Sequence, residues 1–243
     1  MKIRLTLFFL LIAFGYTSAA STEQTAIYNA YTSSNMTLWK KTMDSMHDQA
    51  AKTNEKELEL LNYEYGYIGW SIGNKKTAEA RKYIDRGQQR IDKLMQKNYK
   101  VSMLHAYKSA FYGFEIGLNK AKAPFWGRKS IDEAKRAVAT DANNPFGYIQ
   151  LGNIEFYMPA VFGGSKKKAL GYYLKAEKLM TVGDVEHDWN YLSTLTLIAG
   201  AYEELGNYEK AETYYLKILS ISPQFTWVKN NLYPKFLSKK SNK

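Results

Sequence analysis

Hydrophobic residues recur along most of the chain at the three-to-four-residue spacing of an amphipathic helix, and no segment alternates as a half-buried strand does. The prolines, which interrupt helices, all lie at Pro124 or beyond. The pattern predicts an all-α protein. The expected helices span 23–33, 36–52, 55–72, 76–97, 100–120, 129–140, 145–157, 166–180, 187–205, 208–221 and 224–232.

Two predicted helices near the C-terminus carry complementary small and large residues. The first places Ala199 before Tyr202, a Leu-Gly-Asn turn follows, and the second places Ala211 four residues before Tyr215. Small side chains let antiparallel helices approach closely, while large ones fill the neighbouring grooves. This layout over 192–225 resembles the tetratricopeptide repeat, a helical hairpin of about 34 residues.

The same layout recurs upstream, so we predict four helical pairs after two N-terminal helices, in one domain over 21–243. The segment 224–237 is expected to cap the last pair with Phe225, Trp227 and Val228. The resemblance implies a right-handed superhelix of paired helices. The small residues of the upstream pairs are Gly66 with Ala80, Gly113 with Ser130, and Gly152 with Ala169.

The first twenty residues have the layout of a secretory signal peptide. Lys2 and Arg4 precede an apolar run over 5–16, and small residues follow up to Ser21. The run is shorter than the roughly 20 residues that span a membrane, although a retained anchor is the alternative. The chain has no cysteine for a lipid anchor. We therefore expect cleavage near Ala20 and export to the periplasm, with no requirement for membrane association.

The formal net charge of +11 favours an acidic partner. Because the chain is expected to be exported, nucleic acid is a poor candidate, and a merely solvated lysine-rich surface is the alternative. The absence of cysteine excludes thiolate catalysis and cysteine-metal sites. The sequence also lacks the Gly-x-Ser-x-Gly and His-Glu-x-x-His motifs. We expect a non-catalytic protein without a cofactor.

In each of the two middle pairs the small positions are 17 residues apart, compared with 12 in the last pair. The extra residues fall in 123–129 and 158–167, and each stretch has a proline, an aromatic residue, a glycine and then basic residues. Stacked repeats place equivalent loops side by side, so both are expected at one edge. Trp126 and Phe162 are candidates for contact with a partner, and an anion would be held by Arg128, Lys129, Lys166 and Lys167. The alternative is that these aromatics only pack and that Ser165 caps a helix.

Tyrosines form the second candidate site. The stretch Tyr63, Tyr65, Tyr67 and Trp70 lies on a predicted first helix, and such helices in tetratricopeptide domains line the concave groove that holds a peptide. Tyr157 is a further candidate for contact with a partner. Aromatic residues at helical spacing are also typical of a core, so packing between helices is the alternative.

Histidines offer little support for a metal site. The densest candidate group is Asp184, Glu186, His187 and Asp188. Acids commonly precede a helix, where the helix dipole favours them, so this group is better explained as a helix start.

The stretch Pro-x-x-Phe-Gly-Gly-x-x-x-Lys-Ala-Leu at 159–170 is similar to a pattern in the T-component subunits of TRAP-type transporters. The likeness covers 148–179 and implies a periplasmic helical-repeat subunit.

The sequence is compatible with three candidate functions. The first is a scaffold that binds a protein or peptide in the periplasm or cell envelope. The second is the binding of a small acidic ligand or a transporter-associated role. The third, a hydrolase, has little support.

Overall fold

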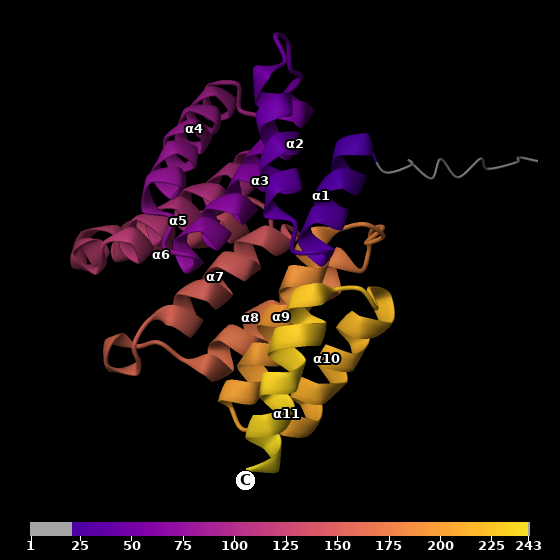
Figure 1. Ribbon diagram of the computed structural model, residues 1–243. Coiled ribbons are helices and arrows are strands. Elements are labelled where there is room, and N and C mark those ends of the chain that lie inside the picture. Colours follow the sequence, from indigo (N-terminus) through magenta and orange to yellow (C-terminus); the bar gives the residue numbers. More distant parts are fainter. Residues whose placement is uncertain (1–20, 243) are drawn as a thin grey trace, which may run out of the picture.

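The computed structural model describes residues 21–242, and every regular element in that range is helical (Figure 1). No helix in this range is both long and apolar enough to cross a lipid bilayer. The α-helices are α1 (Thr22–Thr32), α2 (Met36–Asp48), α3 (Asn54–Gly73), α4 (Thr77–Gln96), α5 (Val101–Leu118), α6 (Ala123–Thr140), α7 (Pro145–Tyr157), α8 (Lys166–Met180), α9 (Trp189–Glu204), α10 (Tyr208–Ile221) and α11 (Tyr233–Ser241).

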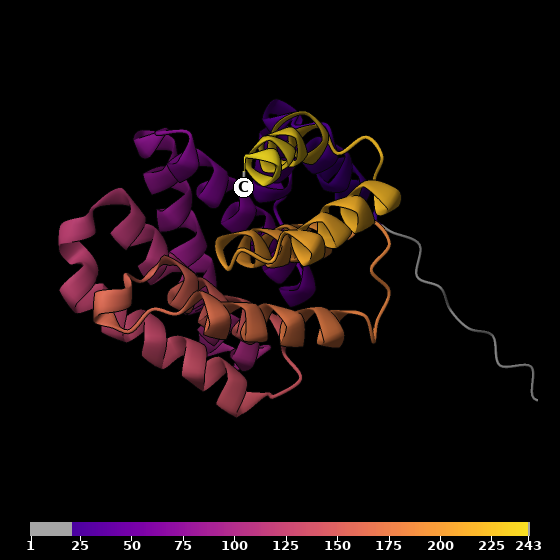
Figure 2. The same ribbon diagram turned by 90° about the horizontal axis from the view of Figure 1, so that it is seen from below.

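The helices pair in the order that the sequence predicts. α3 packs on α4, α5 on α6, α7 on α8 and α9 on α10, with α1 and α2 before them and α11 after them. The pairs follow one another as a curved stack (Figures 1 and 2). The prediction of an all-α, tetratricopeptide-like helical-repeat fold is therefore confirmed.

Glycines allow large rings to approach the helix backbones. A Cβ added to Gly152 would lie 2.4 Å from Cε1 of Tyr173, and one added to Gly87 would lie 2.4 Å from Cζ of Phe111. Both distances are shorter than any van der Waals contact, so each ring occupies the space that a side chain would take. Close packing of the pairs depends on these residues having no side chain.

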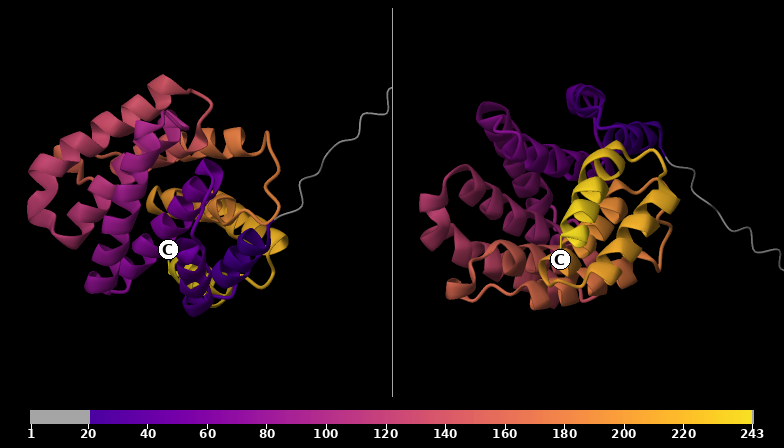
Figure 3. Two further views of the ribbon diagram at one scale, coloured as in Figure 1. Left: turned by 90° about the horizontal axis from the view of Figure 1, so that it is seen from above. Right: turned by 60° about the horizontal axis from the view of Figure 1, so that its bottom comes forward.

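The N-terminal helices fold back onto the last pair (Figure 3). The rings of Trp39 in α2 and Trp189 in α9 meet edge to face with their centroids 5.0 Å apart. The ring of Tyr31 in α1 lies 4.8 Å from that of Phe225. Both indoles approach the backbone of α3 at Gly66, where an added Cβ would lie 2.7 Å from each of them. Aromatic packing therefore joins the two ends of the array.

The start of α6 differs from the prediction. The sequence predicts a loop over 123–129 and a helix from residue 129, but α6 begins at Ala123 after a 3₁₀ turn over Lys120–Lys122. Pro124 lies in the first turn, where a helix loses no hydrogen bond because those N–H groups have no partner within the helix. The proline that suggests a loop thus starts the helix.

The C-terminal cap is confirmed in outline and differs in detail. A π-helix over Val228–Leu232 leads directly into α11. The side chains of Phe225, Val228 and Phe236 are fully buried against the last pair, whereas Trp227 is 43% exposed. Trp227 was expected to pack with its neighbours, but its position on the helical turn directs it outward.

Candidate functional site

Tyr63 and Tyr67 belong to the core. Both side chains are buried, and their hydroxyls donate hydrogen bonds to Glu59 at 2.7 Å and Glu79 at 2.9 Å. The prediction that these two tyrosines contact a partner is therefore corrected, because the same helical spacing that would line a groove here places them between α3 and its neighbours. Tyr157, at the end of α7, is 71% exposed.

The first turns of α6 carry an aromatic cluster around one lysine. The rings of Trp126 and Tyr112 stack with their centroids 4.8 Å apart. Nζ of Lys129 lies 4.1 Å from the centroid of Phe125 and 4.8 Å from that of Trp126. A lysine ammonium over aromatic faces is stabilised by the ring quadrupoles. Lys129 is therefore engaged within the protein, while Arg128 on the same turn is exposed to solvent.

The α7–α8 connection is a loop with its own backbone hydrogen bonds. The amides of Phe162 and Gly164 donate to the carbonyl of Pro159 at 2.9 and 3.2 Å, and the amide of Ser165 donates to the carbonyl of Glu155 at 2.9 Å. These bonds close a 3₁₀ turn over Ala160–Phe162 and return the chain to the end of α7. The loop is thus fixed in shape before any partner arrives.

Two glycines make this loop shape possible. Gly163 has a φ of +98°, in the left-handed region that favours glycine. A Cβ on Gly164 would lie 1.9 Å from the carbonyl oxygen of Met158, which is far inside contact distance. The Gly-Gly pair therefore has a structural role. Ser165 then caps α8 by accepting a hydrogen bond from the amide of Lys168 at 3.3 Å, as the packing alternative expected.

The loop presents apolar side chains to solvent. Val161 is 83% exposed and Phe162 is 74% exposed. The ammonium of Lys166 contacts the carbonyl of Phe156 and lies 3.6 Å from the centroid of its ring, whereas Lys167 is exposed. Of the four predicted cations, Arg128 and Lys167 are therefore the ones most open to an external anion.

The two segments lie at one edge of the molecule (Figure 2). The sequence predicts this shared edge, but it also predicts two loops, and the structure has one helical turn and one loop. Two hollows of about 540 and 490 Å³ lie among the described residues, and neither has a lining residue from either segment. The edge is thus an exposed surface with aromatic and basic side chains.

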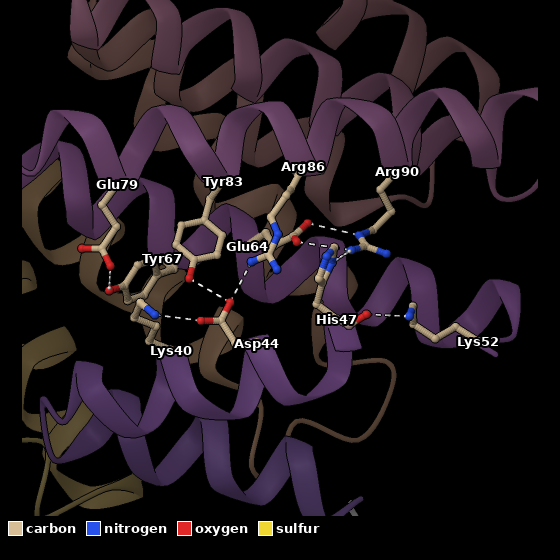
Figure 4. A network of polar contacts seen from close by, with 10 residues as sticks. All are labelled: Lys40, Asp44, His47, Lys52, Glu64, Tyr67, Glu79, Tyr83, Arg86 and Arg90. Carbon is tan, nitrogen blue, oxygen red and sulfur yellow. Dashed lines mark hydrogen bonds and ion pairs between the residues drawn. The ribbon is translucent and has the colours of Figure 1, made fainter. Parts of the chain in front are cut away.

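A buried polar network between α2, α3 and α4 escaped the sequence analysis (Figure 4). Arg90 donates to Glu64 from Nε at 3.1 Å and from Nη2 at 3.3 Å, and it also pairs with Glu57. Nδ1 of His47 lies 3.2 Å from the same Nη2. Burial raises the pKa of Glu64 and lowers that of Arg90, because it disfavours either charge. These contacts of Arg90 join α2, α3 and α4.

Asp44 forms a second part of this network. Its carboxylate accepts hydrogen bonds from Lys40 at 2.7 Å, Arg86 at 2.7 Å and Tyr83 at 2.9 Å. Burial acts to raise the pKa of Asp44, but these hydrogen bonds outweigh it and lower the pKa to about 2. The carboxylate therefore remains charged and ties α2 to α4. Charged residues at helical spacing resemble a solvated face in the sequence, which is why the network was missed.

The acidic turn before α9 is a helix start, as the sequence favours. Asp188 accepts a hydrogen bond from the amide of Asn190 at 2.8 Å and caps α9, and Asp184 accepts one from the amide of Glu186 at 2.8 Å. Within the described range of the chain, three or more histidine or acidic side chains nowhere gather into a group that could hold a metal ion.

Comparison with known proteins agrees with this architecture. No curated protein matches the chain. Residues 192–225, which include most of α9, all of α10 and the following turn, match the tetratricopeptide repeat family. Among solved structures, the HusA haemophore from Porphyromonas gingivalis is similar in fold, with a TM-score of 0.59 and 18% identity over 78% of this chain and 96% of that one. The chain thus contains a tetratricopeptide repeat within an all-α fold that is similar to that of a haemophore.

Proposed function

We propose that this chain is an exported, non-catalytic module that binds a protein partner, acidic in character, at the edge described above. Tetratricopeptide repeats generally mediate protein–protein interaction, which supports the class of function. The proposed contact surface, here called the aromatic-basic edge, comprises Phe125, Trp126, Arg128 and Lys129 of α6 and Tyr157, Val161, Phe162, Lys166 and Lys167 around the α7–α8 connection.

One observation carries this proposal: the α7–α8 loop holds Val161 and Phe162 in solvent on a hydrogen-bonded backbone. Phe125 and Tyr157 of the same edge are also exposed, at 61% and 71%, and a group of exposed apolar side chains is typical of a surface that another molecule covers. A loop that is already ordered loses little conformational entropy on binding, so more of its contact energy remains as affinity. Arg128 and Lys167 beside it would accelerate association with an acidic partner.

The direct test is chemical crosslinking of the mature protein in its own envelope fraction, followed by identification of captured proteins. Phe162→Ser should reduce capture of the specific partner at least about fivefold, the scale of an interface anchor. Leu216→Ser is the matched control, because Leu216 is a 51% exposed apolar residue on α10, remote from the edge in sequence. Equal capture by the wild type and Phe162→Ser would contradict the proposed contact.

The charges are tested separately. Lys166→Glu combined with Lys167→Glu should slow association with the captured partner and remove most of its salt dependence. Lys239→Glu with Lys240→Glu is a control of equal charge change in α11. If both double variants slow association equally, net charge and not the edge is responsible.

The export proposal rests on residues 1–20, which lie outside the described residues. We expect osmotic shock to release the protein and mass spectrometry to find a mature N-terminus near Ser21. A full-length chain in the cytoplasmic fraction would contradict export without affecting the proposed contact surface.

A second candidate function is the binding of a small acidic ligand, because the chain is similar in fold to a haemophore. Haem is a flat apolar ring with two carboxylates, which suits aromatic rings beside cations. Titration with haem should then give a saturable absorbance change that Trp126→Ala with Phe162→Ala abolishes. A change that persists in this double variant would place any haem elsewhere.

A further inference from the structure

Residues from α1, the α8–α9 connection and the end of α10 line a hollow of about 490 Å³. These segments lie together, away from the aromatic-basic edge (Figure 1). Its walls include Tyr28 from α1, Glu186 and His187 from the connection, Ile221 at the end of α10 and Pro223 after it. This volume is in the range of small-molecule sites, which run from about 300 to 1,000 Å³. Three separate segments of the chain therefore build one concavity of ligand size.

Two of these three segments are acidic and the third is neutral, in contrast to the basic protein as a whole. The chain has a formal net charge of +11, but residues 22–39, 179–209 and 218–228 contain no lysine or arginine. The first two segments carry Glu23, Asp184, Glu186 and Asp188 among their acids. A basic protein thus has a hollow whose lining includes neither lysine nor arginine, and such a surface favours a positively charged ligand.

The three acidic residues of the α8–α9 connection have different structural roles. The carboxylates of Asp184 and Asp188 accept backbone amide hydrogen bonds and so shape the turn and cap α9. The carboxylate of Glu186 is 78% exposed, and its one ion-pair contact is Nδ1 of His187 at 3.8 Å. Glu186 is therefore the carboxylate at this hollow that remains available to a ligand.

The rings of Tyr28 and His187 complete the wall. They meet edge to face with their centroids 5.1 Å apart. His187 has a φ of +56°, a left-handed backbone conformation that costs a non-glycine residue about 1–2 kcal/mol. The α8–α9 connection thus holds the ring of His187 beside that of Tyr28 in a strained backbone conformation. Such strain is common at ligand-binding sites.

We propose that this hollow binds an organic cation, namely an ammonium or guanidinium group on an apolar stem. Glu186 supplies the opposite charge, the ring of Tyr28 supplies a face for the cation, and Ile221 and Pro223 contact the stem. The cation belongs either to a free amine or to a lysine or arginine side chain of another chain. The site is independent of the aromatic-basic edge and of its proposed partner.

The test is titration of the purified mature protein with 1,5-diaminopentane and, separately, with a capped tripeptide that has lysine between two alanines. Calorimetry gives the affinity, and NMR shifts of the amides of Tyr28 and His187 locate the site. We expect saturable binding, with tighter binding of the diamine indicating a free amine and tighter binding of the tripeptide indicating a partner side chain.

Variants distinguish this site from general attraction. Glu186→Gln and Tyr28→Leu should each weaken binding about three- to fivefold, the scale of one partly exposed charge or cation–π contact. Glu209→Gln makes the same charge change on α10, at a position that does not line the hollow, and should leave affinity unchanged. The proposal is overturned if neither probe saturates by about 10 mM, or if Glu209→Gln weakens binding as much as Glu186→Gln does.

Discussion

The α5–α6 and α7–α8 connections share one order of residue types but have different structures. In the first, Pro124 enters the opening turn of α6, and Trp126 stacks on Tyr112. In the second, Pro159 precedes a 3₁₀ turn that ends at Gly163 in a left-handed conformation, and Phe162 points into solvent. The comparison teaches that the backbone position of proline and glycine, and not composition, decides whether an aromatic side chain packs or is presented.

Glycine substitutions should reveal the largest difference between the two connections in the free energy of unfolding. Gly164→Ala would place a methyl group 1.9 Å from the carbonyl oxygen of Met158, so the backbone of the loop must move. We expect a loss of about 3 kcal/mol in the free energy of unfolding, measured in urea.

Gly127→Ala is the matched change in the α5–α6 connection. Nothing lies within 4 Å of an added Cβ there, and the residue is helical. Alanine should stabilise the protein by about 0.5 kcal/mol, because it restricts the unfolded chain. Similar losses for both variants would mean that the two connections do not differ as described.

Substitution of the aromatic residues Trp126 and Phe162 should give the next largest difference in stability. Trp126→Ala removes a ring that stacks on Tyr112 and lies 4.8 Å from Nζ of Lys129, so we expect a loss of about 2 kcal/mol. Phe162→Ala removes a ring that is mostly exposed, so its effect on stability should stay within about 0.5 kcal/mol. Thermal unfolding of both variants checks this. A large loss for Phe162→Ala would show that its ring packs in solution.

Substitutions at the residues just before α6 and α8 should give the smallest difference in stability between the two connections. Ser165→Ala removes the side chain that caps α8 and should cost about 1 kcal/mol. Lys122, at the corresponding position before α6, makes no side-chain cap, so Lys122→Ala should lose only its half-buried ion pair with Glu115, about 0.5 kcal/mol. Urea unfolding measures both, and equal costs would argue against a distinct cap at α8.

The fold was predictable because its signals are local. Gly152 and Ala169, or Ala199 and Ala211, lie at positions where two helices must approach, and this is visible within about 35 residues. The four pairs follow from such positions. The start of α6 was mispredicted because Pro124 is compatible with both a loop and a first helical turn.

The site was less predictable because its contacts join distant segments. Burial of Tyr63 and Tyr67 depends on the helices packed around them, and the pairing of Arg90 with Glu64 depends on how α3 meets α4. A single sequence does not show which of the distant residues pack against or pair with one another. That the segments 123–129 and 158–167 lie at one edge was predictable, since they occupy equivalent places in successive pairs (Figure 2).

The contact of Trp39 with Trp189 has a consequence for how the molecule opens. In a linear array the terminal units fray independently, because each touches only its neighbour. Here α1 and α2 rest on the last pair, so separating either end exposes indole surface at the other. We expect native-state hydrogen exchange to show α1 and α10 opening together, as one cooperative unit, in place of a gradient of protection that falls toward each terminus.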